Sequence, residues 1–206
     1  MKKIISGLCL LALTSCGAKK ESTTLDRSPT QELETTPGSF KAILRPYNFK
    51  LAGWIPSGMA DIKIEGDEIE IKSWLDDSAN VMHRQNIHFG SRCPGVDDDT
   101  NNDGFVDLNE TKKVVQEVFL PLDQDLDSLS LDENNYPVGN FSYHQTASIS
   151  SLTQKLKKNL NLSGKVIIVM GVASNRGLPT TVSQENNQTR ESSIPIACGV
   201  IERMPN

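Results

Sequence analysis

The sequence predicts a mainly β domain, a sandwich or barrel of short strands with one or two short helices. Residues 61–72 alternate apolar and polar side chains around a central Gly-Asp pair, which is typical of a hairpin. Further runs of strand length are separated by turn residues, as in all-β sandwiches. Residues 166–169 are continuously apolar and β-branched, which indicates a central strand buried on both faces.

The hairpin also predicts its own register. Gly66 is the first of the two turn residues, which suits a type II′ turn. This turn places Ile64 opposite Ile69 on one face of the sheet and Lys63 opposite Glu70 on the other. The other predicted strands span residues 41–45, 79–89, 139–147, 166–170 and 194–201.

Two helices are predicted between these strands. One spans residues 111–120 and is stopped by Pro121, because proline cannot continue a helix. The other places Leu152, Leu156 and Leu160 on one stripe, at the spacing of an amphipathic helix.

Composition limits the function classes. The chain has 206 residues, with 21 Lys and Arg against 26 Asp and Glu, a formal charge of -5 and 37% hydrophobic residues. The low apolar content excludes a polytopic membrane protein, and the acidic balance argues against a nucleic-acid partner. The length fits one globular domain, or one domain with a tail.

The first residues resemble a bacterial lipoprotein signal. A positively charged start precedes an apolar run at residues 4–13, which is too short to span a bilayer. Residues 13–16, Leu-Thr-Ser-Cys, resemble the lipobox, so we expect residues 1–15 to be removed and Cys16 to be lipidated. The membrane is then a partner through the lipid anchor, at the bacterial cell envelope. In a Gram-negative host, Gly17 implies the outer membrane. The alternative is an ordinary signal peptide with a chance cysteine.

Residues 16–39 are predicted to form the lipidated cysteine and a tether. Between residues 17 and 38 only Ala18, Leu25 and Leu33 are apolar, so this segment cannot bury enough surface to offset the entropy of ordering it. Its expected r.m.s. reach is about 25 Å. The folded domain then spans residues 40–206.

Residues 99–110 fit the twelve-residue EF-hand calcium loop. Gly104 at the sixth position permits the sharp turn, and the aliphatic Val106 follows two residues later. The predicted oxygen ligands are Asp99, Asn101, Asp103, the carbonyl of Phe105, Asp107 and Glu110. The carboxylates of so short a segment repel one another unless a cation neutralises them, which predicts calcium as the cofactor. The alternative is a solvated acidic turn.

The segment before this loop differs from a true EF-hand. Residues 89–95 contain two glycines and a proline and cannot form the entering helix, whereas residues 111–120 supply an exit helix. The sequence therefore predicts a single calcium loop inserted between β elements, where the ion stiffens a connection. A paired calcium sensor that opens a groove is disfavoured.

Several stretches resemble the copper/zinc superoxide dismutase family. Residues 193–201 resemble its last strand, which carries an Ala-Cys-Gly-Val-Ile signature, and residues 131–141 with 164–170 resemble the stretch that leads to its last copper-binding histidine. Residues 83–90 stand where the family has a His-X-His strand, and they also resemble CHRD-like bacterial proteins. The resemblance covers most of residues 40–203 and implies a Greek-key β-sandwich or barrel.

The resemblance further implies a disulfide between Cys93 and Cys198. Two thiols in an exported compartment most often form one disulfide. Dismutase activity is not expected, because the family's catalytic residues are replaced. Asn86 stands for the first histidine of His-X-His, Met170 for the last copper ligand, and Pro195 for the arginine that attracts superoxide.

The sequence therefore predicts an envelope-anchored lipoprotein with a noncatalytic, calcium-binding domain in a structural or binding role. A second hypothesis is an exported copper-binding protein. His83, His88 and Met170 would converge if the fold were that of the family, and such ligands suit copper(I). The alternative is that Met170 packs in the core and the histidines form local hydrogen bonds.

Overall fold

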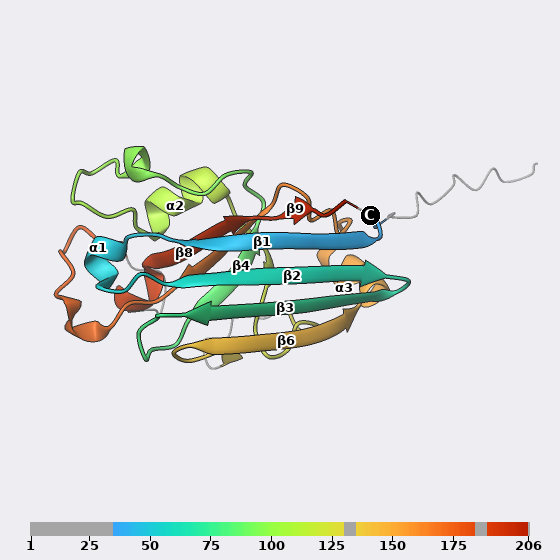
Figure 1. Cartoon of the computed structure of the whole chain (residues 1–206). Helices are drawn as coiled ribbons and strands as arrows, with labels where there is room; N and C mark the ends of the chain where they lie inside the picture. The colour runs from blue at the N-terminus through green and yellow to red at the C-terminus, as the bar shows by residue number, and fades with distance from the viewer. Residues whose placement is uncertain (1–34, 130–134, 184–188, 206) are drawn as a thin grey trace, which may run out of the picture. The chain divides into compact units, whose positions relative to one another are not determined.

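The computed structural model describes residues 35–129, 135–183 and 189–205, so the predicted signal peptide, Cys16 and most of the tether lie outside the described residues. The described chain forms one antiparallel sheet that curls into a half-barrel (Figure 1). The strands are β1 (Gly38–Pro46), β2 (Ser57–Glu65), β3 (Glu68–Asp76), β4 (Arg84–His88), β5 (Val118–Pro121), β6 (Phe141–Ser148), β7 (Val166–Met170), β8 (Pro195–Val200) and β9 (Glu202–Arg203). The helices are α1 (Phe49–Ala52), α2 (Leu108–Val115) and α3 (Ile149–Leu156), with 3-10 turns η1 (Val96–Asp98), η3 (Ser174–Arg176) and η4 (Glu191–Ser193).

The order of the strands runs from one edge of the curled sheet to the other. Hydrogen-bonded neighbours follow the order β5-β4-β7-β8-β1-β2-β3-β6, and β9 pairs with β1. In Figure 1, β1, β2, β3 and β6 form the near layer, while β4 passes behind them. These observations confirm the predicted mainly β fold class with short helices. No helix among the described residues is long and apolar enough to cross a bilayer.

The β2–β3 hairpin forms with the predicted register. Ile64 pairs with Ile69, and Lys63 pairs with Glu70. Gly66 has a φ of 58°, the positive value that the first position of this turn requires. The two isoleucines are buried while Lys63 is exposed, so one face of the hairpin packs on the core and the other contacts solvent.

The main core fills the inside of the curled sheet. Ile69 of β3, Ile87 of β4 and Ile167 of β7 are fully buried in one cluster, although β3 is not a neighbour of either other strand. Ser73 of β3 donates a buried hydrogen bond of 2.9 Å to the side chain of Gln85 in β4. The two layers of the half-barrel therefore meet through their side chains.

A second apolar cluster lies on the other face of β7. Ile168 and Met170 pack there with Leu108 and Val115 of α2 and with Cys198 of β8. Every residue of β7 is buried, and its side chains alternate between the two clusters. The prediction of a central strand buried on both faces is confirmed.

The predicted helix at residues 111–120 is wrong at both ends. The helix begins at Leu108, because Asp107 and Glu110 form a reciprocal capping box, and it ends at Val115. Gln116 has a φ of 62°, which breaks the helix, and residues 118–121 form β5 on the edge of the sheet. Pro121 is tolerated there because an edge strand has one side without a ladder partner.

Replacing Gly90 with alanine is expected to lower the free energy of unfolding by about 1–3 kcal/mol. A Cβ atom at this position would lie 2.4 Å from the Cα of Val115, so α2 must move away from the end of β4. Chemical denaturation at neutral pH measures the loss. Gly95→Ala in the same segment is the control, because the nearest atom to its Cβ is 4.0 Å away. Equal stability of the two variants would contradict this account.

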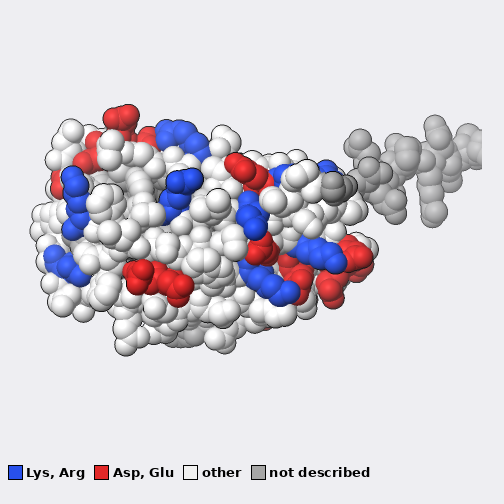
Figure 2. Space-filling model, in the orientation of Figure 1, with Lys and Arg blue, Asp and Glu red and all other residues white. Residues whose placement is uncertain are grey.

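The solvent-facing side of β1, β2 and β3 carries charges of both signs. Figure 2 shows Lys and Arg interspersed with Asp and Glu over this part of the molecule. Lys41 lies 3.5 Å from Asp61 on the neighbouring strand, and both side chains are exposed. Exposed pairs of this kind contribute little to stability. They give this face a mixed charge.

Candidate functional site

The predicted calcium loop connects η1 to α2. Asp99 follows the last residue of η1, and Asp107 is the N-cap of α2. Glu110 lies in the first turn of α2 and is buried together with Asp107. The loop therefore ends in a helix, as the sequence predicts, but it is entered from a 3-10 turn.

Glu110 reaches back across the loop to its beginning. Its Oε1 accepts hydrogen bonds from the backbone N–H of Thr100 at 2.6 Å and of Asn101 at 3.2 Å. Its Oε2 accepts a hydrogen bond from the N–H of Asp107 at 3.1 Å. The last predicted ligand thus lies beside the first residues of the loop, as a closed loop requires.

The carboxylates of the first half of the loop also accept backbone hydrogen bonds. Asp99 accepts from the N–H of Asp103 at 3.2 Å and from that of Gly104 at 2.9 Å. Asp103 accepts from the N–H of Phe105 at 3.1 Å. Gly104 has a φ of 91°, a conformation that side chains rarely allow, which explains the glycine at this position.

Two contacts from a distant segment fix the outer side of the loop. Thr181 donates its hydroxyl to Asp103 at 2.5 Å, and the N–H of Ser183 donates to Asp107 at 2.7 Å. Sequence reasoning missed both residues, because no local pattern links them to a loop more than seventy positions earlier.

The loop produces a negative field around Tyr47. Burial raises the pKa of Tyr47, and the carboxylates of Asp98, Glu110 and Asp99 raise it further. Arg92 offsets one of these charges: its guanidinium donates two hydrogen bonds to Asp98 and lowers the pKa of that carboxyl to about 2. Among the described ion pairs, none joins a Lys or Arg side chain to Asp99 or Glu110.

The donor set fits a hard cation, although the carboxylates are engaged with N–H groups. All the predicted ligands offer oxygen, the ligand that calcium prefers. Among the described residues, however, no group of three or more His, Cys, Asp or Glu side chains is placed to hold a metal ion. A cation bound by Oε1 of Glu110 would compete with the hydrogen bonds from the N–H groups of Thr100 and Asn101.

Cys93 and Cys198 form a disulfide, as the family resemblance implies. Their Cα atoms are 5.9 Å apart, and 105 positions separate them in the sequence. Cys93 lies just before η1, and Cys198 lies in β8. The bond therefore ties the entry of the predicted calcium loop to the sheet.

Of the three residues of the copper hypothesis, His88 lies apart from Met170. Met170 pairs with Arg84, and His88 pairs with Val166 at the other end of the same ladder. Four positions at 3.3 Å each separate His88 from Met170 by about 13 Å along the strands.

The two buried histidines instead make local hydrogen bonds. Both ring nitrogens of His83 lie near backbone oxygens, Nδ1 at 3.1 Å from that of Met170 and Nε2 at 2.9 Å from that of Ala79. Nδ1 of His88 lies 3.2 Å from the backbone oxygen of Gln116. Burial lowers the pKa of both rings, that of His88 to about 4.

Asn86, which the predicted resemblance places at a copper-ligand position, lies in a buried polar row on β4. Asn86 accepts a hydrogen bond from the hydroxyl of Tyr136 at 3.1 Å. Arg84 is buried, and its guanidinium carbon lies 5.8 Å from the centre of the same aromatic ring. Pro195 is the first residue of β8. None of these groups supplies a metal-binding imidazole next to His88.

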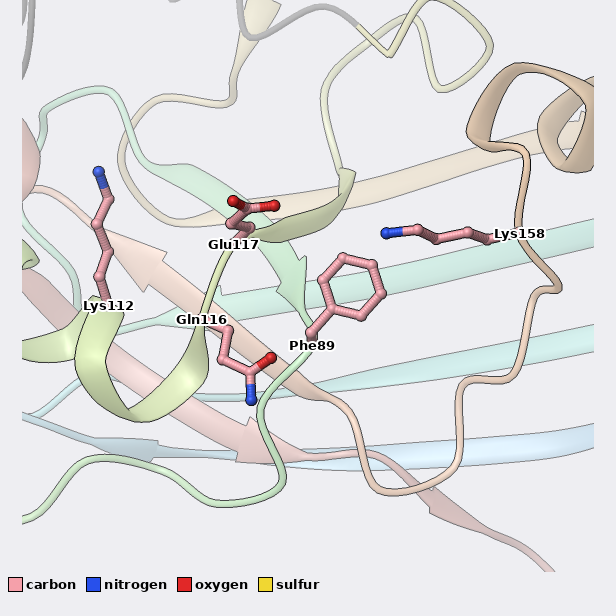
Figure 3. A pocket seen from close by; sticks show the side chains of 5 residues that line it. All are labelled: Phe89, Lys112, Gln116, Glu117 and Lys158. Carbon is pink, nitrogen blue, oxygen red and sulfur yellow. The ribbon is translucent and has the colours of Figure 1, made fainter. Parts of the chain in front are cut away.

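A surface hollow of about 560 Å³ lies beyond the end of β4, lined by Phe89, Lys112, Gln116, Glu117 and Lys158. In Figure 3 the ammonium group of Lys158 points toward Phe89, and its nitrogen lies 4.2 Å from the ring centre. The side chain of Lys112 extends away from this ring, and the polar ends of Gln116 and Glu117 point in different directions. Binding pockets place their polar groups around one point, so this hollow does not resemble one.

Comparison with known proteins gives a likeness among solved structures. No protein-family model matches the chain, and no curated protein matches it. Among solved structures, the crystal structure of the clock protein EA4 aligns with a TM-score of 0.37 and 12% sequence identity, over 83% of this chain and 98% of that chain. The assignment to the mainly β class therefore depends on the curled antiparallel sheet of the chain itself.

Proposed function

We propose that this protein is an envelope-anchored bacterial lipoprotein whose dismutase-like domain binds calcium and has a structural or binding role without catalysis. The signal at residues 1–15 and the lipidated Cys16 are supported by the sequence alone. The dismutase-like assignment is supported by the signature at the end of the chain and by the disulfide that the resemblance implies.

The observation that carries the calcium proposal is the position of Glu110. A glutamate in the first turn of a helix reaches back to the N–H groups at the second and third positions of the loop. The carboxylate of Glu110 therefore places a negative charge beside the first residues of the loop, which suits a divalent cation with oxygen ligands. Asp99, Asn101 and Asp103 are the other predicted side-chain ligands in the first half of the loop.

The absence of catalysis is proposed from residue chemistry. Asn86, Met170 and Pro195 stand where the resembling family has two copper ligands and its arginine. An amide and a thioether in these places cannot reproduce the set of imidazoles that holds copper through both oxidation states. The domain is then a scaffold, and the ion stiffens the connection between β4 and α2.

Calcium is expected to raise the thermal stability of the full chain, because an ion that binds only the folded state stabilises it. The increase in the free energy of unfolding is about 2.7 kcal/mol at a calcium concentration one hundred times the Kd. Thermal unfolding in EDTA and over a series of calcium concentrations up to the millimolar range measures the effect. Glu110→Gln keeps the size of the side chain but removes its charge, so most of the increase should disappear.

Glu68→Gln is the matched control for this experiment. Glu68 is exposed at the start of β3 and lies outside the loop, so the same chemical change there should leave the calcium effect intact. The proposal fails if millimolar calcium leaves the melting temperature of the natural chain unchanged. It also fails if Glu110→Gln shows the same increase as Glu68→Gln.

A further inference from the structure

One side chain outside the loop pairs with both backbone groups of Val106, the residue between two predicted ligands. The Oδ1 of Asn48 accepts a hydrogen bond from the N–H of Val106 at 3.1 Å. The Nδ2 of Asn48 donates to the carbonyl of Val106 at 3.0 Å and to the carbonyl of Pro195 at 3.0 Å. The carboxamide thus uses its acceptor and both of its N–H donors.

These bonds join three separate parts of the fold. Asn48 follows β1 and precedes α1, Pro195 begins β8, and Val106 belongs to the loop. Asn48 has a φ of 50° and a ψ of 26°, a left-handed conformation that asparagine tolerates better than most residues. The backbone turns at this residue where the carboxamide meets the loop.

The planarity of the peptide bond extends this contact to the predicted ligands. The N–H of Val106 and the carbonyl of Phe105 belong to one trans peptide group, so they point in opposite directions. Because that N–H faces Asn48, the Phe105 carbonyl faces away from Asn48. In the next peptide group, the carbonyl of Val106 faces Asn48, and the N–H of Asp107 therefore faces away as well.

The side away from Asn48 is the side of the last predicted ligand. The N–H of Asp107 donates there to the Oε2 of Glu110 at 3.1 Å. The carbonyl of Phe105, the backbone ligand of the predicted set, thus faces the same side of the chain as Glu110. A rotation of either peptide group would turn one of these groups out of the loop.

We infer that Asn48 is a positioning residue of the calcium loop, which holds two successive peptide groups so that the Phe105 carbonyl and the Asp107 N–H face Glu110. This inference rests on the proposed calcium binding. It assigns control of the calcium affinity to the residue that follows β1. A residue 58 positions before Val106 would then set the affinity of the loop.

Calcium titration of the full chain by isothermal calorimetry tests the inference, at a temperature where every variant is folded. Asn48→Gly removes the carboxamide and keeps the left-handed backbone without strain. Removing an outer partner of a metal ligand typically weakens affinity by about 10-fold to 100-fold, and we expect at least a tenfold loss. Asn140→Ala is the control, because the side chain of Asn140 accepts hydrogen bonds from Ser78, outside the loop. It should bind calcium like the natural chain.

The outcomes separate this inference from the calcium proposal. If the natural chain binds no calcium, the proposed function fails and the role of Asn48 fails with it. If the natural chain binds and Asn48→Gly has the same Kd, only the role of Asn48 is overturned. If Asn48→Gly does not fold, Asn48→Asp replaces it, because aspartate keeps the acceptor and loses both donors. Its added charge favours cations, so weaker binding by Asn48→Asp supports the inference, and equal or tighter binding overturns it.

Discussion

Removing the disulfide is expected to lower the free energy of unfolding by about 4–5 kcal/mol. The bond closes a loop across 105 positions, and cross-links over loops of about 100 residues restrict the unfolded chain by about 4.7 kcal/mol in the chain-entropy model. Domains of this size are stable by only about 5–15 kcal/mol in total. The reduced protein should therefore lie close to its unfolding threshold at 37 °C.

The loss should be measured by urea denaturation of the natural chain with and without a reductant. The control is a chain in which Cys93 and Cys198 are both replaced by alanine, whose denaturation midpoint should not respond to the reductant. Alanine is preferred to serine because Cys198 lies in the apolar cluster with Ile168 and Met170, where a hydroxyl would be buried. An unchanged midpoint for the reduced natural chain would contradict the expected result.

Local patterns predicted the parts of the fold that form between sequence neighbours. The β2–β3 hairpin was predictable to the residue, because a two-residue turn fixes which side chains face each other. The strand at residues 118–121 was not predictable, because the apolar pattern of residues 111–120 is compatible with a helix. The deciding interactions are the ladder of β5 with β4 and the left-handed backbone at Gln116, and neither appears in a local pattern.

The candidate site divides in the same way. The twelve positions of the predicted calcium loop are contiguous, so their spacing is visible in the sequence. The contacts from Asn48 and Thr181 come from segments that are distant from the loop in the sequence. Asn48 lies just after β1, and Thr181 lies between β7 and β8. The copper hypothesis needed the register of β4 with β7, which separates His88 from Met170 along one ladder.

Acidification is expected to destabilise the domain through His88. Burial is the main cause that lowers the pKa of this ring to about 4, and the charges of Lys112 and Arg84 lower it further. In the unfolded chain the ring has a pKa of about 6.5. Between pH 6.5 and 4 the unfolded ring is therefore protonated while the folded ring stays neutral. The stabilising effect is therefore fully present above pH 6.5 and is lost as the pH falls toward 4, by up to about 3 kcal/mol.

His88→Asn isolates this contribution from the other groups that titrate over the same range. Asparagine keeps a side-chain N–H that can donate to the carbonyl of Gln116, and it does not titrate. Urea denaturation at pH 7 and pH 4.5 should show a loss in the natural chain that exceeds the loss in His88→Asn by about 2–3 kcal/mol. His83 is present in both proteins, so its own lowered pKa cancels in the difference. Equal losses in the two chains would mean that the ring of His88 accepts a proton in the folded state as readily as in water.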